Sequence, residues 1–276
     1  MTGMINDITR YYDETSRDYR LIWRTGRHLS MHMGYSDEEA YRHDQAVIRM
    51  VDELARRARI TRDDIVADLG CGLGGSSIWL AENIGCAVIG VDINPRSIAV
   101  ARVEAERRGL GGLVTFTQAD FSNTRLVSNT VDVAWFLESL CYAPSKRAAV
   151  VELARILTPR GRVVIADGFK VADSEELRLW LSGWAVPDLV TVPELKADLE
   201  SLGFQVRYED ITARVLPSLK MLHDHGRRLY PLGRTLERFG MRTRTQTGNI
   251  LGAIYAYESV LRGQWRYGIF VAERKA

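Results

Sequence analysis

Cysteine is scarce in this sequence, and long apolar runs are missing from it. Cys71, Cys86 and Cys141 are the only cysteines among 276 residues, and their spacing, without a C-x-x-C pair, indicates neither a disulfide framework nor a zinc site. No stretch approaches the roughly 18 apolar residues of a membrane-spanning helix, and the polar N-terminus M-T-G-M-I-N-D has no hydrophobic signal core. We therefore expect a cytoplasmic protein that holds no metal and does not insert stably into a membrane.

An excess of charge of either sign is also missing. The chain has 37 lysines and arginines against 35 aspartates and glutamates, and it has no basic run with interleaved aromatic residues that would indicate a nucleic-acid partner. One local basic region, formed by Arg227, Arg228, Arg242 and Arg244, is interpreted as a solvated helix face. With 46% hydrophobic residues, the composition is that of an ordinary globular domain with elaborations.

From residue 61 onward, stretches typical of strands alternate with helical patterns. We expect strands at 65–67, 86–92, 114–118, 131–137, 162–166, 204–211 and 267–272, and helices at 5–18, 37–58, 76–82, 95–108, 146–157, 174–184 and 192–202. Ser36, with Glu39 three residues later, predicts a capping box for the second helix. The alternation predicts an α/β fold: a Rossmann-like, doubly wound seven-stranded sheet with N-terminal helices and a helical insertion before the last strand.

The stretch I-V-A-D-L-G-C-G-L-G-G-S-S places a glycine-rich turn between the first strand and a helix, as in nucleotide-binding crossovers. Gly70, Gly72 and Gly75 fit G-x-G-x-x-G, the dinucleotide fingerprint. Asp68 followed by Gly70, Gly72 and Gly74 fits D-x-G-x-G-x-G, and here the segment resembles the first motif of class I S-adenosylmethionine-dependent methyltransferases. A carboxylate at Asp68 would repel a pyrophosphate but favours a sulfonium and an ammonium, so we favour the methyl donor.

Two further carboxylates follow the next two strands and would complete a nucleoside site. Asp92 ends the second strand, where a carboxylate can accept both ribose hydroxyls. Ile93 would cover one face of adenine, and Asp120 is placed to accept from the adenine amino group, with Phe121 beside the ring. The residues predicted to bind S-adenosylmethionine, released as S-adenosylhomocysteine, are Asp68, Gly70, Cys71, Gly72, Gly74, Asp92, Ile93, Asp120, Phe121 and Leu137. An NAD-dependent oxidoreductase is the alternative from a different class; Asp68, Asp120 and the missing Tyr-x-x-x-Lys pair argue against it.

The end of the fourth strand, F-L-E-S-L-C-Y-A-P, resembles the I-E-A-T-C-H-A-P stretch of sterol C-methyltransferases. The N-terminal R-Y-Y-D, followed by Tyr19, Trp23 and His32, is similar to that family's Y-Y-x-L-x-x-x-F-Y-x-x-x-W region, and the similarity covers about residues 9–169. It implies attack by an alkene carbon on the methyl group, which leaves a carbocation for a carboxylate and aromatic faces to stabilise. The predicted catalytic residues are Glu138, Tyr142 and Tyr19.

Two departures from that family widen the range of acceptors. Tyr142 stands where the sterol enzymes have histidine, and L-H-D-H-G at 222–226 does not match them. A smaller prenylated or terpenoid molecule of secondary metabolism therefore fits as well as a sterol. An O- or N-methyltransferase remains the second enzyme hypothesis; its candidate bases are His28, His32 and His43.

The pattern of expected helices and strands divides the chain into four parts. These are an N-terminal helical lid (1–60), a Rossmann-like methyltransferase core (61–213), a helical cap insertion (214–262) and the final strand of the core (263–276). The expected partner is a hydrophobic small molecule, and a homo-oligomer is left open. The spacing of Trp180 and Trp184 favours ordinary core packing over a wall of the site.

Overall fold

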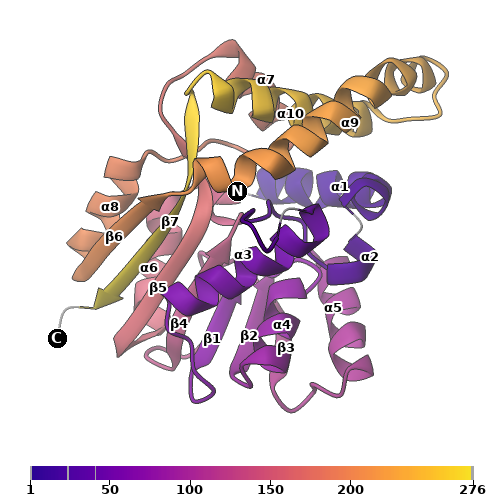
Figure 1. Ribbon diagram of the computed structural model, residues 1–276. Helices are drawn as coiled ribbons and strands as arrows, with labels where there is room; N and C mark the ends of the chain where they lie inside the picture. Colours follow the sequence, from indigo (N-terminus) through magenta and orange to yellow (C-terminus); the bar gives the residue numbers. More distant parts are fainter. Residues whose placement is uncertain (1, 24, 41, 275–276) are drawn as a thin grey trace.

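A seven-stranded sheet in the order β3-β2-β1-β4-β5-β7-β6 forms the centre of the computed structural model (Figure 1), which describes residues 2–23, 25–40 and 42–274. Its strands are β1 (Ile65–Leu69), β2 (Ala87–Asp92), β3 (Val114–Gln118), β4 (Val131–Leu137), β5 (Leu157–Lys170), β6 (Phe204–Asp210) and β7 (Trp265–Arg274). The pairings along β3-β2-β1-β4-β5 are parallel, whereas β7 runs antiparallel to both β5 and β6. The predicted fold class is confirmed.

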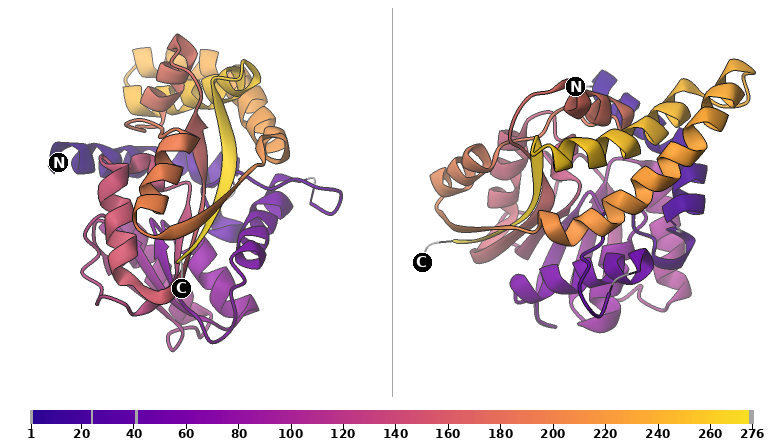
Figure 2. Two further views of the ribbon diagram at one scale, coloured as in Figure 1. Left: turned by 90° about the vertical axis from the view of Figure 1, so that its left-hand side faces the viewer. Right: turned by 45° about the horizontal axis from the view of Figure 1, so that its top comes forward.

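Helices cover both faces of the sheet because alternate strand residues point to opposite sides. Val66 and Val133 belong to a buried cluster with α3, α4 and α5, whereas Ala67 and Ala134 face α6 and α8. Figure 2 shows these layers from two further directions. The helical segments are α1 (Thr2–Asp18), η1 (Tyr19–Trp23), α2 (Thr25–His28), α3 (His43–Arg57), α4 (Gly75–Asn83), α5 (Pro95–Arg107), η2 (Leu140–Tyr142), α6 (Lys146–Ile156), α7 (Glu175–Gly183), α8 (Val192–Ser201), α9 (Thr212–Arg238) and α10 (Arg244–Leu261). None of the helices among the described residues is long and apolar enough to span a membrane.

The second helix begins later than predicted, and the predicted capping box is wrong. α3 starts at His43, and Ser36 has a buried hydroxyl oxygen without a hydrogen-bond partner. Instead, Asp37 Oδ1 accepts from the backbone N–H groups of Glu39 (3.1 Å) and Ala40 (2.9 Å). Aspartate side chains that bond to nearby backbone in this way compete with helix formation, which explains the delayed start.

The fifth strand is longer than the predicted 162–166. β5 pairs with β4 from Val131 opposite Leu157, loses register, and resumes with Val133 opposite Arg162. The residues between form a bulge, which admits extra residues into one strand of a pair. The strand then continues beyond the edge of β4 to Lys170 through its pairing with β7.

The α9–α10 hairpin lies above the carboxyl edge of the sheet and packs on the N-terminal helices and α7 (Figures 1 and 2). Arg242 pairs with Asp18, and Tyr11 donates from its hydroxyl to Asn249 Oδ1 at 2.8 Å. Tyr11 is 2% exposed, so the N-terminal segment contributes to the same apolar interior as the hairpin. The insertion and the chain start therefore jointly cover the edge where ligands of such sheets bind.

Two glycines one turn apart on α10 have opposite surroundings. A Cβ atom on Gly252 would lie 2.3 Å from Cδ1 and 2.5 Å from Nε1 of Trp184, whose ring is held by a hydrogen bond from Nε1 to the Asn249 carbonyl at 3.2 Å. A Cβ atom on Gly248 would meet only the Gly183 Cα, at 3.9 Å. Of these two glycines, only Gly252 is needed for the close contact between α10 and Trp184.

We expect opposite effects from alanine at these positions. Gly248→Ala should raise the free energy of unfolding by about 0.5–1 kcal/mol, because alanine favours a helix over glycine. Gly252→Ala should lower the free energy of unfolding by about 1–3 kcal/mol, because the clash of the new methyl group with the Trp184 ring costs more than the gain in helix propensity. Urea unfolding of both variants measures the two changes, and a stabilisation of similar size in both would contradict this packing.

Candidate functional site

The turn after β1 combines three glycines in the left-handed backbone region. Gly70, Gly72 and Gly74 have φ values of 86°, 53° and 85°. A Cβ on Gly70 would lie 2.3 Å from Ser139 Cβ, whereas one on Gly72 would meet only Met31 Cε, at 3.4 Å. Gly74 is the N-cap of α4. The glycines therefore have separate tasks: Gly70 allows close packing on the end of β4, Gly72 keeps the backbone open toward a cavity, and Gly74 starts the helix.

The glycine-loop cavity lies beside this turn and encloses about 1020 Å³, part of which is open to solvent. Of the ten residues predicted to bind the donor, nine line it: Asp68, Gly70, Cys71, Gly72, Asp92, Ile93, Asp120, Phe121 and Leu137. Gly74 does not, because its position at the start of α4 turns it toward Ala101 and Phe116. The N-terminal segment closes the cavity through Leu29, Ser30, Met31 and His32.

Asp92 is held rigidly at the end of β2. Its Oδ2 accepts from the Gly72 N–H and its Oδ1 from the Asn94 N–H, both at 2.8 Å. Burial raises the pKa of this carboxyl, while these backbone N–H groups act in the opposite direction. Each oxygen uses one lone pair on the backbone, which leaves capacity for two hydroxyl donors from a ligand in the cavity.

Asp68 and Asp120 lie on other walls of the same cavity. Asp68 Oδ2 accepts from the Ser77 hydroxyl at 2.6 Å, and burial raises its pKa to about 7. Asp120 Oδ1 accepts from the backbone N–H and the hydroxyl of Ser122, at 2.8 and 2.7 Å, which orients the carboxylate. Three carboxyl groups around one cavity create a site for a ligand that carries positive charge.

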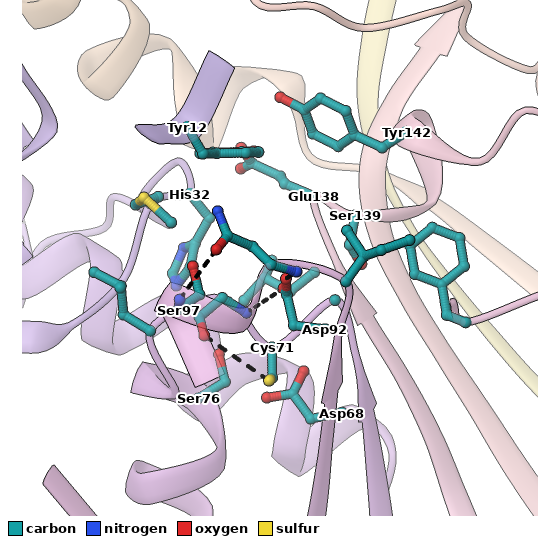
Figure 3. Close-up of a pocket in the computed structure, with 18 of the residues that line it drawn as sticks. Tyr12, His32, Asp68, Cys71, Ser76, Asp92, Ser97, Glu138, Ser139 and Tyr142 are labelled. Atoms are coloured by element: carbon teal, nitrogen blue, oxygen red, sulfur yellow. Dashed lines mark hydrogen bonds between the residues drawn. The ribbon is translucent and has the colours of Figure 1, made fainter. Parts of the chain in front are cut away.

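Glu138 connects three distant segments at the end of β4. Its φ of 51° is left-handed, a conformation that costs a residue other than glycine about 1–3 kcal/mol and is found most often at functional sites. Its Oε1 accepts from the Met33 N–H at 2.5 Å and from the Tyr267 hydroxyl at 2.7 Å. In Figure 3 the carboxyl lies next to Tyr12 and Tyr142, across the cavity from Asp68. Burial raises the pKa of Glu138 to about 8, against the effect of these two donors.

Glu138 also borders a second space, which we call the aromatic cavity. It encloses about 510 Å³ and shares Tyr12, Met31, Glu138 and Tyr142 with the glycine-loop cavity. Its remaining walls are Tyr19, Trp23, Met33, Cys141, Asp167, Gly168, Trp180, Trp184, Val186, Leu189, Trp265 and Tyr267. Half of the residues that line this cavity are therefore aromatic, and Glu138 places a carboxyl group where it meets the first cavity.

Asp167 is a second carboxyl in the aromatic cavity, and it was not predicted. It follows Ala166, whose carbonyl accepts from the Glu138 N–H at 2.8 Å, so the two acids lie on neighbouring strands. Asp167 accepts from the backbone N–H groups of Cys141 (2.9 Å) and Gly168 (2.8 Å), and burial raises its pKa to about 6. The sequence did carry a signal: an acidic residue follows the apolar run of this strand, as it does in β1.

The structure distributes the remaining candidates between the two cavities. Tyr142 borders both, while Tyr19 lines only the aromatic one. Since Tyr11 donates to Asn249, Tyr19 is the donor in the 3.0 Å contact between the two tyrosine hydroxyls. Trp180 and Trp184, interpreted from spacing as core residues, are buried and also form cavity wall. Tyr267 was missed because nothing near it in sequence indicates a site.

Of the three candidate histidine bases, only His32 lines the glycine-loop cavity. Its Nδ1–H donates to the Met33 carbonyl at 3.0 Å, so the uncharged ring has its lone pair on Nε2, which is buried without a partner. Burial lowers the pKa of His32 to about 3. His28 has both ring nitrogens engaged by Trp23 and Ser30 backbone. His43 lies against Trp23 and Ser218.

Comparison with known proteins gives one family. Residues 67–165 match the family model "Methyltransferase domain". An O-methyltransferase of Penicillium expansum, cnsE, is 30% identical over 80% of this chain and 80% of its own length. A sterol 24-C-methyltransferase of Eremothecium gossypii is 28% identical over 72% of this chain, and the match spans about half (54%) of that relative. A geranyl diphosphate C-methyltransferase of Streptomyces coelicolor A3(2), crystallised with S-adenosyl-L-homocysteine, has the same fold, with a TM-score of 0.80 at 18% identity over 99% and 98% of the two chains.

The fold and the cavity define a nucleoside-binding α/β protein whose glycine turn is surrounded by acids rather than bases. The chain belongs to the class I S-adenosylmethionine-dependent methyltransferases. The predicted family and methyl donor are confirmed, and the dinucleotide alternative is set aside.

The raised pKa of Asp68 predicts how donor affinity depends on pH. A cation next to Asp68 favours its ionised form, so below the pKa of about 7 the binding of that cation must displace a proton. Affinity for S-adenosylmethionine should therefore rise with pH between 6 and 8.5, with proton release on binding. Isothermal titration calorimetry in buffers of different ionisation enthalpy measures both quantities.

Asp68→Asn is the control for this experiment, because the amino group of the ligand titrates equally in both proteins. The variant should show a weaker rise with pH and release fewer protons than the wild type. Equal pH profiles for the two proteins, or a flat wild-type profile, would contradict the coupling.

Proposed function

We propose that this protein transfers the methyl group of S-adenosylmethionine to an alkene carbon of a hydrophobic prenylated, terpenoid or sterol-like small molecule in the cytoplasm. The observation that carries the proposal is the position of Glu138, between a cavity suited to the donor and a cavity walled by aromatic rings. The sterol and geranyl diphosphate enzymes among the similar proteins are named as C-methyltransferases, which supports this reaction type. Residues 1–60 would act as a lid and 214–262 as a cap.

The glycine-loop cavity fits the donor chemically. At Gly72 no Cβ blocks the approach of a ligand to the backbone. Each carboxylate oxygen of Asp92 accepts one backbone hydrogen bond and can accept another from one of two vicinal hydroxyls. The Nε2 atom of His32, buried and unpartnered, offers an acceptor to the ammonium or to the amino group of the base. Asp68, Asp120 and Leu137 would complete the site.

The aromatic cavity fits an acceptor that is apolar and uncharged. Its lining includes no lysine or arginine among the residues that the structure describes, and its two carboxyls would oppose an anionic group. Tyr12 and Tyr142, with ring centroids 5.7 Å apart, contact each other and line this cavity together with Glu138. An acceptor without a diphosphate suits these walls better than geranyl diphosphate itself.

When bound, S-adenosylmethionine supplies an electrophilic methyl group, which the alkene takes up as the S–CH₃ bond electrons return to sulfur and a neighbouring carbon becomes cationic. Aromatic faces around that carbon stabilise it by cation–π contact, worth about 0.5–2 kcal/mol each. Glu138 stabilises the cation more than the neutral alkene and can accept the proton lost from an adjacent carbon. Tyr19 and Tyr142 hold the acceptor in line with the methyl group.

O-methylation is the second candidate, and Asp167 favours it. A carboxyl group with a pKa of about 6, in the cavity that would hold the acceptor, could take the proton of an acceptor hydroxyl. The Penicillium relative is named as an O-methyltransferase. Alkene methylation gives the main catalytic role to Glu138, whereas O-methylation gives it to Asp167. Substitution of each acid therefore distinguishes the two reactions.

Glu138→Gln keeps the shape of the side chain but removes its charge. If an alkene is methylated, single-turnover rates at saturating donor should fall about 100-fold, which is near 3 kcal/mol in the barrier, with donor affinity within a few-fold of wild type. Product formation from a panel of prenylated alcohols and phenols, followed by mass spectrometry with labelled donor, gives the rates.

Asp167→Asn is the matched variant. Alkene methylation predicts a smaller effect than that of Glu138→Gln, whereas O-methylation predicts the reverse order. A Glu138→Gln rate within twofold of wild type would remove Glu138 from the chemistry.

A further inference from the structure

A third space adjoins the aromatic cavity on the side away from the donor, and no part of the proposed reaction uses it. This hairpin cavity encloses about 640 Å³, partly open to solvent, between α9, α10 and η1. It is lined by Asp18, Ile22, Trp23, Trp184, Leu222, Gly226, Leu229, Leu232, Gly233, Leu236, Arg242, Asn249, Ile250 and Ala253.

Trp23 and Trp184 line both this cavity and the aromatic one. Their rings meet edge to face with centroids 6.4 Å apart, so these two side chains form a wall that the two cavities share. Trp184 is fixed by Gly252 and the Asn249 carbonyl, whereas Trp23 belongs to the π-helical turn η1, a geometry that often marks functional sites. The three cavities therefore form a series from the donor side to the hairpin, in which each cavity shares lining residues with the next.

The hairpin cavity suits an apolar chain. Most of its lining is aliphatic or aromatic, and the charge of Arg242 is neutralised by its pair with Asp18. Gly226 and Gly233 line it from α9, where the missing side chains let α10 pack closely: a Cβ atom on them would lie 3.0 Å from Ile254 Cγ1 and Ile250 Cδ1, respectively. Two of its lining residues on α9, Leu229 and Leu232, are 38% and 56% exposed, so apolar surface of the cavity reaches the solvent.

We propose that the acceptor is elongated: its reacting alkene lies at Glu138, and its apolar tail passes Trp23 and Trp184 into the hairpin cavity. This inference rests on the proposed function and narrows its substrate class to chains longer than the aromatic cavity alone can hold. The hairpin cavity then sets the preferred chain length, because each added methylene buried there strengthens binding.

The test uses geraniol, farnesol and geranylgeraniol, which differ in length by one prenyl unit each. Their affinities for the full-length protein saturated with S-adenosylhomocysteine are measured by quenching of tryptophan fluorescence. Wild type should bind the longest alcohol at least tenfold more tightly than the shortest. Ala253→Phe, which fills the hairpin cavity from α10, should bind geraniol within twofold of wild type and lose the gain with length.

Two further variants keep the outcome decisive. Ala172→Phe makes the same change at an exposed position outside the three cavities and should behave as wild type. Leu229→Trp, at a partly exposed site on α9, narrows the cavity without touching the core, and it should also remove the length dependence if Ala253→Phe fails to fold. The inference is overturned if these cavity variants keep the full gain with length, if they weaken all three alcohols equally, or if no alcohol binds.

Binding and turnover separate the two proposals. Length-dependent binding that the cavity variants abolish, without methylated product from any alcohol, would support the tail site and reject alkene methylation of these acceptors. Product from geraniol at an unchanged rate in Ala253→Phe, with no length dependence in wild type, would support the reaction and reject the tail site.

Discussion

The carboxyl group of Glu138 is the point on which the arrangement of the site depends. Its two hydrogen bonds come from Met33, in the segment after α2, and from Tyr267, in the last strand. Neither partner is near it in sequence, so a single buried oxygen holds the chain start and the chain end against the centre of the sheet. The left-handed backbone at Glu138 is stable only because these contacts over-determine it. The segment after α2 and the last strand thus meet at the same atom, which belongs to the residue proposed to carry the reaction.

The parts of the site that could be predicted are those whose signal is local. The glycine spacing, Asp92 and Asp120 each follow a strand directly, and in a parallel sheet such positions gather at one edge whatever the loops do. Helix starts were harder: Ser36 and Glu39 fit a capping box, but α3 begins only at His43, because Asp37 binds the backbone N–H groups of Glu39 and Ala40. The aromatic walls could be named only singly, since which rings share a cavity is a property of tertiary packing.

The role of Tyr267 illustrates the limit most clearly. It lies 129 residues from Glu138, in a strand whose sequence is otherwise ordinary core. Its register follows from the antiparallel pairing of β7 with β5, which places it opposite Gly168 at the carboxyl edge. No periodicity in the sequence encodes that register, because it is set by how the insertion before β7 returns to the sheet. Which residues form strands can be predicted from the sequence, but how strands that are far apart in sequence pair is known only from the folded structure.

That return has a consequence for how this family can diversify. The helices α9 and α10 leave the sheet from β6 and re-enter it at the neighbouring β7, where Asp210 pairs with Gly268. Because the two ends of the excursion lie side by side, the excursion can lengthen, shorten or change its inner face while the strands that carry the glycine turn stay in register. Under the proposed function, this excursion would recognise the acceptor while the sheet that binds the donor stays unchanged, and one scaffold could then serve acceptors of very different shape.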